Sequence, residues 1–104
     1  MTAFAAAVAV LFRDPNMAAD ALWRPGGTGA PVPVRVIKRA PDAEVGFGEA
    51  RARIPAVLLE LRVAEAADPA SGDLIELGGS TYRLQGTPRR DPHRLIWTAE
   101  AVEL

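Results

Sequence analysis

The chain has 104 residues, enough for one domain with a core of its own and too few for two. Its 12 lysine and arginine residues are balanced by 13 aspartate and glutamate residues, and the net charge of -1 excludes an overall basic field that would draw the protein to nucleic acid. The absence of cysteine excludes disulfides and thiolate metal sites, and it fits a reducing compartment.

The alanine-rich run over residues 3–13 predicts an N-terminal helix, with Thr2 as its N-cap and Asp14-Pro15 after its end. This run is too short to span a bilayer and lacks the basic start of a signal peptide. One stripe of the helix is apolar, so we expect it to pack on a sheet or on a neighbouring subunit. The stripe contains Phe4, Val8, Leu11 and Phe12.

The rest of the chain predicts a β-meander, in which strands are separated by turn residues. Strands are predicted over residues 21–24, 32–39, 54–65, 74–77, 81–85 and 95–104. In the second strand, Val34 and Val36 share a face while Arg35 and Lys38 can remain solvated, and Pro33 indicates an edge or a strand start. For residues 54–65 a helix is the alternative prediction, but the period-two placement of the aliphatic residues favours a strand.

Three turns are predicted from residues with specific turn-forming properties. Residues 68–73 form a turn in which Asp73 is expected to accept hydrogen bonds from backbone N–H groups. Gly78-Gly79 can supply the positive φ values of a two-residue hairpin. A basic turn, residues 89–94, precedes the last strand.

Two long segments, residues 25–31 and 40–53, lack strand periodicity. The first is rich in glycine, but it does not end in the Gly-Lys-Ser/Thr pattern of a phosphate loop, so a flexible hairpin loop is expected. The second predicts a long, mobile connection with Phe47 as its anchoring aromatic.

No residue pattern indicates catalysis, a metal or a cofactor. His93 is the only histidine, it lies in a turn, and no cysteine is available to complete a metal site with it. Ser71 and Ser80 both belong to turns, so nothing in the spacing supports a Ser-His-Asp triad. The scattered aromatics are expected to pack in the core or at an interface. They are Trp23, Phe47, Tyr82 and Trp97.

Arg89, Arg90 and Arg94 form the one basic cluster, opposed only by Asp91. Such a cluster is either a solvated, salt-bridged turn or a contact with an acidic partner surface or with phosphates, because arginine forks bind both. These three arginines are the candidate partner or DNA contacts.

The order of these motifs resembles the head-tail joining proteins of tailed bacteriophages, the lambda-type head-completion or stopper group, and their counterparts in gene transfer agents. The resemblance covers nearly the whole chain. It is carried by the helix with Asp14-Pro15-Asn16, residues 31–37, Gly46-Phe47-Gly48-Glu49, residues 69–73, the hairpin at residues 79–82, and Leu95-Ile96-Trp97-Thr98.

The resemblance implies one mainly β domain over residues 1–104, a small antiparallel β-sandwich or partly open barrel with one short N-terminal helix and long loops. It implies no catalysis and no membrane. The implied role is a homo-oligomeric ring, expected to be a hexamer, in the neck of a virion or phage-like particle and assembled in the bacterial cytoplasm. Its implied partners are portal or adaptor proteins on the head side, tail terminator or tail-tube proteins on the tail side, and double-stranded DNA in the lumen.

Six domains of about 13 Å radius of gyration would leave a hole on the order of 30 Å, which duplex DNA could pass. The long loops are candidates to line this channel or to clasp a neighbour. The residues concerned are Gly26, Gly27, Gly29, Glu44, Gly46, Phe47, Gly48, Glu49 and Arg51. The alternative is a monomeric small β-barrel that binds nucleic acid or a peptide through its arginine cluster and an exposed aromatic.

Overall fold

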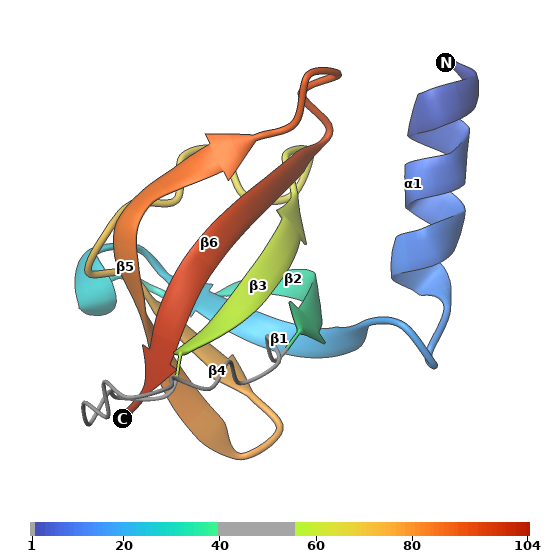
Figure 1. Cartoon of the computed structure of the whole chain (residues 1–104). Helices are drawn as coiled ribbons and strands as arrows, with labels where there is room; N and C mark the ends of the chain where they lie inside the picture. Colours follow the sequence, from blue (N-terminus) through green and yellow to red (C-terminus); the bar gives the residue numbers. More distant parts are fainter. Residues whose placement is uncertain (1, 40–55) are drawn as a thin grey trace, which may run out of the picture.

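The computed structural model describes residues 2–39 and 56–104. Within those residues the chain has one α-helix, one short 3-10 turn and six strands (Figure 1). They are α1 (Ala3–Arg13), β1 (Ala19–Arg24), η1 (Pro25–Gly27), β2 (Val32–Arg39), β3 (Ala56–Arg62), β4 (Leu74–Leu77), β5 (Ser80–Arg90) and β6 (Ile96–Glu103). No helix in the described part is long and apolar enough to cross a membrane.

The six strands form a closed antiparallel barrel in the order β1-β2-β3-β6-β5-β4. Four of the six pairings join strands that follow each other in the chain, and the other two are β3 with β6 and β1 with β4. The pairing of β1 with β4 closes the barrel, which leaves no sheet edge between them. The predicted mainly β fold with one N-terminal helix is confirmed, and the barrel is closed rather than partly open.

The barrel interior is the main hydrophobic core. Alternate residues of each strand point inward, as the period of two requires, so Val34 and Val36 of β2 are both buried. The largest fully buried side chains of this core are Val36, Leu59, Leu61, Ile75 and Leu84. Burial of each such side chain contributes about 1.5–3 kcal/mol. Trp23, Tyr82 and Trp97, expected in the core or at an interface, all belong to this core.

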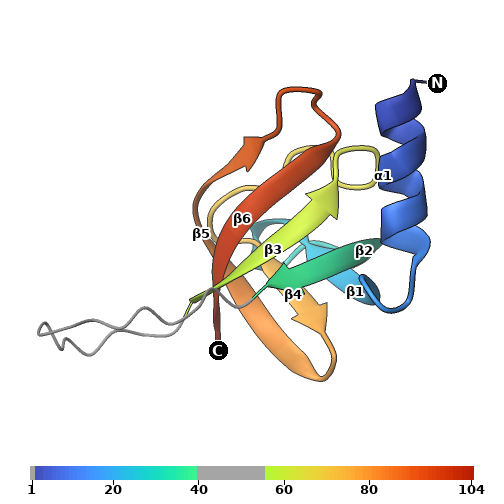
Figure 2. The same cartoon turned by 45° about the vertical axis from the view of Figure 1, so that its right-hand side comes forward.

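Helix α1 packs on the outer wall of the barrel (Figures 1 and 2). Thr2 is its N-cap as predicted, because its Oγ1 accepts a hydrogen bond of 3.0 Å from the backbone N–H of Ala5. A second, small core joins the helix to the barrel; it contains Phe12, Ala18 and Ile37, with Val8 and Ile96 packed against them. Only part of the predicted stripe is therefore covered, and Phe4 and Leu11 remain exposed.

Two strand ends differ from the sequence prediction. β3 ends at Arg62 instead of continuing to residue 65, because the chain turns there and the N–H groups of Glu65 and Ala66 both donate to the Arg62 carbonyl. β5 continues to Arg90 instead of ending at residue 85, because its ladder with β6 resumes after an irregularity between Gln85 and Arg89. β1 also begins earlier, at Ala19.

The turns follow the predicted chemistry. Gly78 and Gly79 have φ values of 62° and 85°, as a two-residue hairpin of this type requires. Asp73 accepts a hydrogen bond from the N–H of Ala70, so its predicted structural role in the turn is confirmed. The predicted loop over residues 25–31 begins with η1 and is held by a 3.0 Å hydrogen bond from the N–H of Gly29 to the carbonyl of Pro25.

Candidate functional site

The turn between β5 and β6, residues 91–95, lies at one end of the barrel, at the top in Figure 1. Asp91 organises this turn from within. Its Oδ1 accepts hydrogen bonds from the N–H groups of Leu95 and Ile96 at 2.7 and 2.8 Å, and its Oδ2 accepts one from His93 at 3.1 Å. A single carboxylate thus satisfies three backbone donors and fixes the path of the turn.

Partial burial raises the pKa of the Asp91 carboxyl, but the hydrogen bonds from the N–H groups of Ile96, Leu95 and His93 outweigh burial. The net effect is a pKa below the ordinary aspartate value, because these bonds stabilise the ionised form. Asp91 is consequently a charged element of the turn, and its two oxygens are already engaged by the backbone.

Three arginines surround the turn, and the structure corrects the place of two of them. Arg89 and Arg90 belong to strand β5 and pair with Thr98 and Trp97, whereas only Arg94 lies in the turn itself. All three are exposed, and within residues 2–39 and 56–104 none of them takes part in an ion pair. The Arg90 guanidinium lies 5.2 Å from the centroid of the Trp97 ring, a cation–π distance.

Arg94 also has an unusual backbone. Its φ is 58°, in the left-handed region, and it is the one residue other than glycine with a positive φ among the described residues. A side chain with a Cβ is disfavoured there by roughly 1–2 kcal/mol, whereas glycine is not. The turn therefore retains an arginine side chain at a position where glycine would be less strained.

Helix α1 reaches the same end of the molecule. The ring of Phe4 stacks on the exposed ring of His93, with 4.1 Å between centroids and 21° between planes. The outer side of Phe4 stays accessible, since 56% of the residue is exposed. An apolar ring and three exposed arginines thus lie at the same end of the molecule, which we name the tip; it comprises Phe4, Arg89, Arg90, His93 and Arg94.

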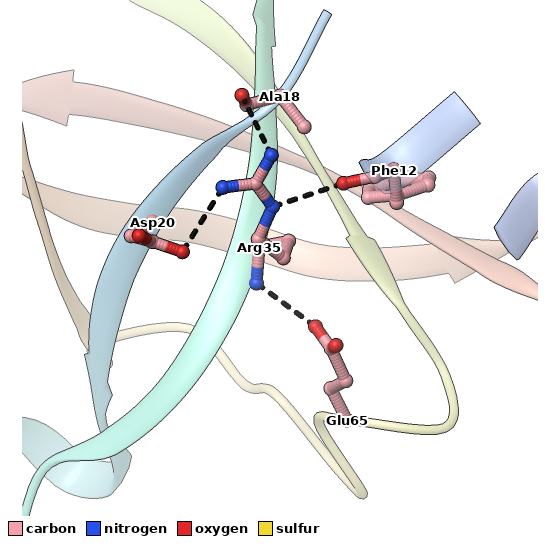
Figure 3. Close-up of polar contacts among 5 residues, drawn as sticks. All are labelled: Phe12, Ala18, Asp20, Arg35 and Glu65. Atoms are coloured by element: carbon pink, nitrogen blue, oxygen red, sulfur yellow. Dashed lines mark hydrogen bonds and ion pairs between the residues drawn. The ribbon is translucent and has the colours of Figure 1, made fainter. Parts of the chain in front are cut away.

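At its other end, α1 is held by Arg35 (Figure 3). The Arg35 guanidinium donates to the carbonyls of Phe12 and Ala18 at 2.9 and 3.1 Å and to Asp20 Oδ1 at 3.0 Å. The sequence predicts that Arg35 can remain solvated; its side chain is only 25% exposed, because the end of the helix and the start of β1 fold over it. Lys38, as predicted, is exposed.

A second surface lies on the barrel wall made by β1, β2 and β4. It is an open hollow of about 300 Å³. We name it the acidic hollow; it is lined by Asp20, Ala21, Leu22, Pro33, Val34 and Glu76. Glu76 Oε2 pairs with Arg24 at 2.6 Å, and Asp20 is held by Arg35 as described, with 92% of its side chain exposed. Two carboxylates thus flank apolar side chains.

Three of the predicted loop residues fall within residues 2–39 and 56–104. Gly26, Gly27 and Gly29 lie beside the turn that precedes β4, where the N–H of Gly26 donates to Asp73 Oδ1 at 2.7 Å. This place is separate from the tip. The other predicted loop residues lie outside the described residues; they are Glu44, Gly46, Phe47, Gly48, Glu49 and Arg51.

The sequence singles out the three arginines and places Phe4 in the apolar stripe of the helix, but it does not single out Asp20 or Glu76 as surface features. Their signal is weak, because two carboxylates on separate strands look ordinary in the sequence. No three His, Cys, Asp or Glu residues of the described segments are grouped so that they could hold a metal ion. What these surfaces offer chemically is complementary charge and apolar contact.

A scan against protein-family models matches residues 1–101 to the family described as Phage Head-Tail Attachment protein. Searches of the curated proteins and of the solved structures found no significant match. The family match spans the helix, the barrel and all three arginines, and it agrees with the family that the motif order resembles. The chain therefore belongs to the phage head-tail attachment protein family.

Proposed function

We propose that this protein is a structural component of the neck that forms a homo-oligomeric ring between the head, at its portal or adaptor, and the tail. Membership of the head-tail attachment family carries the proposal, because the match covers residues 1–101 of the 104. Family membership supports a structural role at the junction of head and tail. The family is one of structural phage proteins and not of enzymes. Ring formation is our extension of that role.

The fold suits a building block of this kind. A closed barrel leaves no unpaired sheet edge that would invite uncontrolled strand addition. Assembly must then use side-chain surfaces, and the tip and the acidic hollow are two such surfaces. Residues 25–31 and 40–53 remain candidates to line the channel or to contact a neighbour.

We further propose that the ring helps to retain packaged DNA after the head is filled. The net charge of -1 suits this task, because a strongly basic lumen would grip the genome that must later leave. A phage virion and a gene transfer agent would use such a ring in the same way. In either case the protein would be located in the neck of the particle, after assembly in the bacterial cytoplasm.

The direct test is an in vitro joining assay. Filled heads made without this protein and separately purified tails are mixed with the purified chain, and joined particles are counted by electron microscopy. We expect joining to depend on the added chain and to reach a plateau at a fixed number of copies per head. Equal joining with and without the chain would refute the neck role.

The alternative is a monomeric binding module, and the exposed arginines favour nucleic acid as its ligand. Arg90 beside Trp97, with Arg89 and Arg94 nearby, offers cationic groups that could contact phosphates. Retention of the isolated monomer on DNA, lost as salt increases and accompanied by no effect on joining, would favour this function.

A further inference from the structure

We propose that the tip of one copy docks into the acidic hollow of a second copy, in a head-to-tail contact between identical chains. The inference rests on the proposed ring, since a ring needs a contact that repeats from subunit to subunit. It adds which surfaces meet and which residues make the contact.

The apolar part of the contact is supplied by Phe4 on one side and by Leu22 and Pro33 on the other. Phe4 stacks on His93 with 4.1 Å between ring centroids and is still 56% exposed, so it presents an accessible apolar ring. The acidic hollow offers about 300 Å³ with those two apolar side chains in its lining. Aromatic and arginine side chains are the groups that most often dominate protein interfaces.

The tip carries arginines, whereas the acidic hollow carries two carboxylates, each paired with an arginine of its own chain. The tip has three exposed arginines without an ion-pair partner among the described residues. The acidic hollow has Asp20 and Glu76, and their ion pairs engage one oxygen of each, Oδ1 and Oε2. A carboxylate accepts several hydrogen bonds, so each can take a second arginine from a neighbouring copy.

The positions of the two surfaces favour a directional contact. In the closed order of six strands, β1 and β6 are three strands apart, so the wall with the acidic hollow lies across the barrel from β6. The tip lies where β5 and β6 join. Because different patches meet, the contact is heterologous and generates a ring when the rotation closes. A twofold pairing of tips would instead oppose arginines to arginines.

Cross-linking tests this geometry directly, because the chain has no cysteine of its own. Pro92 in the turn and Pro33 in the acidic hollow are both exposed, so a variant with Pro92→Cys and Pro33→Cys keeps every charged residue. With a short bis-maleimide, we expect a ladder of dimers, trimers and larger species from the double variant and monomer from each single variant. No ladder, or equal dimer from one single variant, would overturn the proposal.

Charge reversal in the same background tests which side chains make the contact. Arg94→Glu alone and Asp20→Arg alone should each lower the multimer yield about tenfold, and the two together should restore it. Arg83→Glu and Glu100→Arg make the same charge changes at exposed positions of β5 and β6 outside both surfaces, so they should leave the ladder intact. Far-ultraviolet circular dichroism confirms that each variant is folded. Equal losses in the control variants would refute specific pairing.

Measurements of head-tail joining and of retention on DNA distinguish the docking proposal from the neck role and from phosphate binding. A chain that joins heads to tails but gives no ladder would leave the neck role standing and overturn the docking geometry. A ladder without joining would support the docking and overturn the neck role. If Arg94→Glu keeps the ladder and instead abolishes retention on DNA, the tip contacts phosphates and the docking proposal fails.

Discussion

The indole Nε1 of Trp23 donates a hydrogen bond of 2.8 Å to Oδ2 of Asp73, and both side chains are buried. Asp73 also accepts from the backbone N–H groups of Ala70 and Gly26. One carboxylate therefore links β1, the start of η1 and the turn before β4. Because β1 pairs with β4 to close the barrel, this link lies at the closure of the fold.

Asp73→Ala should lower the free energy of unfolding by about 3 kcal/mol, because three buried or half-buried donors lose their acceptor at once. Trp23→Phe keeps an aromatic ring and removes one donor, so it should cost less. Urea unfolding of both single variants and the double variant measures the coupling. Additive losses in that cycle would show that the bond from indole to carboxylate contributes little.

Arg35→Ala should free helix α1 while the barrel stays folded. The variant loses three hydrogen bonds that hold the helix end and the start of β1, for which we expect a cost of about 2 kcal/mol. Hydrogen exchange should accelerate in residues 5–13 and remain slow in β3 and β6. The matched control is Arg39→Ala, because the Arg39 side chain is more exposed than that of Arg35 and loss of its pair with Glu60 should cost under about 1 kcal/mol. Faster exchange throughout the barrel would contradict this local role.

Asp91 should make stability depend on pH. Its pKa in the folded state is lowered, so its contribution is present in full above the unfolded aspartate pKa of about 3.9 and is lost as the pH falls through the folded pKa. Asp91→Ala should cost about 1 kcal/mol at neutral pH, as the loss of a capping side chain does. Asp91→Asn retains an acceptor oxygen and should cost less. Urea unfolding between pH 7 and pH 3 should show that the free energy of unfolding of both variants falls less steeply toward acid pH than that of the unmodified protein. An unchanged dependence on pH would show that Asp91 does not contribute to it.

Most of the fold is predictable because its local signals are strong. The helix has a capping threonine and an uninterrupted alanine-rich run, and Val32–Arg39 forms β2 with the predicted bounds. The Gly78-Gly79 hairpin follows from φ values that few other residues adopt. Barrel closure has no such signal, because β1 and β4 are far apart in the chain and their pairing depends on the whole arrangement.

The errors have physical causes. Glycine and proline often mark the end of a strand, so Gly86 and Pro88 suggest that β5 stops there. In the structure Gly86 has a φ of 74° at an irregularity, and the pairing of β5 with β6 resumes at Arg89. Arg35 looked solvated because its strand position faces outward, and the sequence does not show that the helix end folds over it. The tip combines residues from the two halves of the chain, Phe4 and His93, and the sequence does not show that their rings stack.

Arg94→Gly should separate stability from assembly. The residue has a φ of 58°, so glycine relieves left-handed strain and should raise the free energy of unfolding by about 1 kcal/mol. The same change removes a guanidinium from the tip, so the cross-linked ladder described above should weaken even though the fold is more stable. Arg94→Lys is the matched variant, since it keeps both the charge and the strain: it should leave stability unchanged and retain part of the ladder. Urea unfolding and cross-linking of both variants decide the matter. A more stable Arg94→Gly protein with an undiminished ladder would show that the Arg94 side chain does not contribute to assembly.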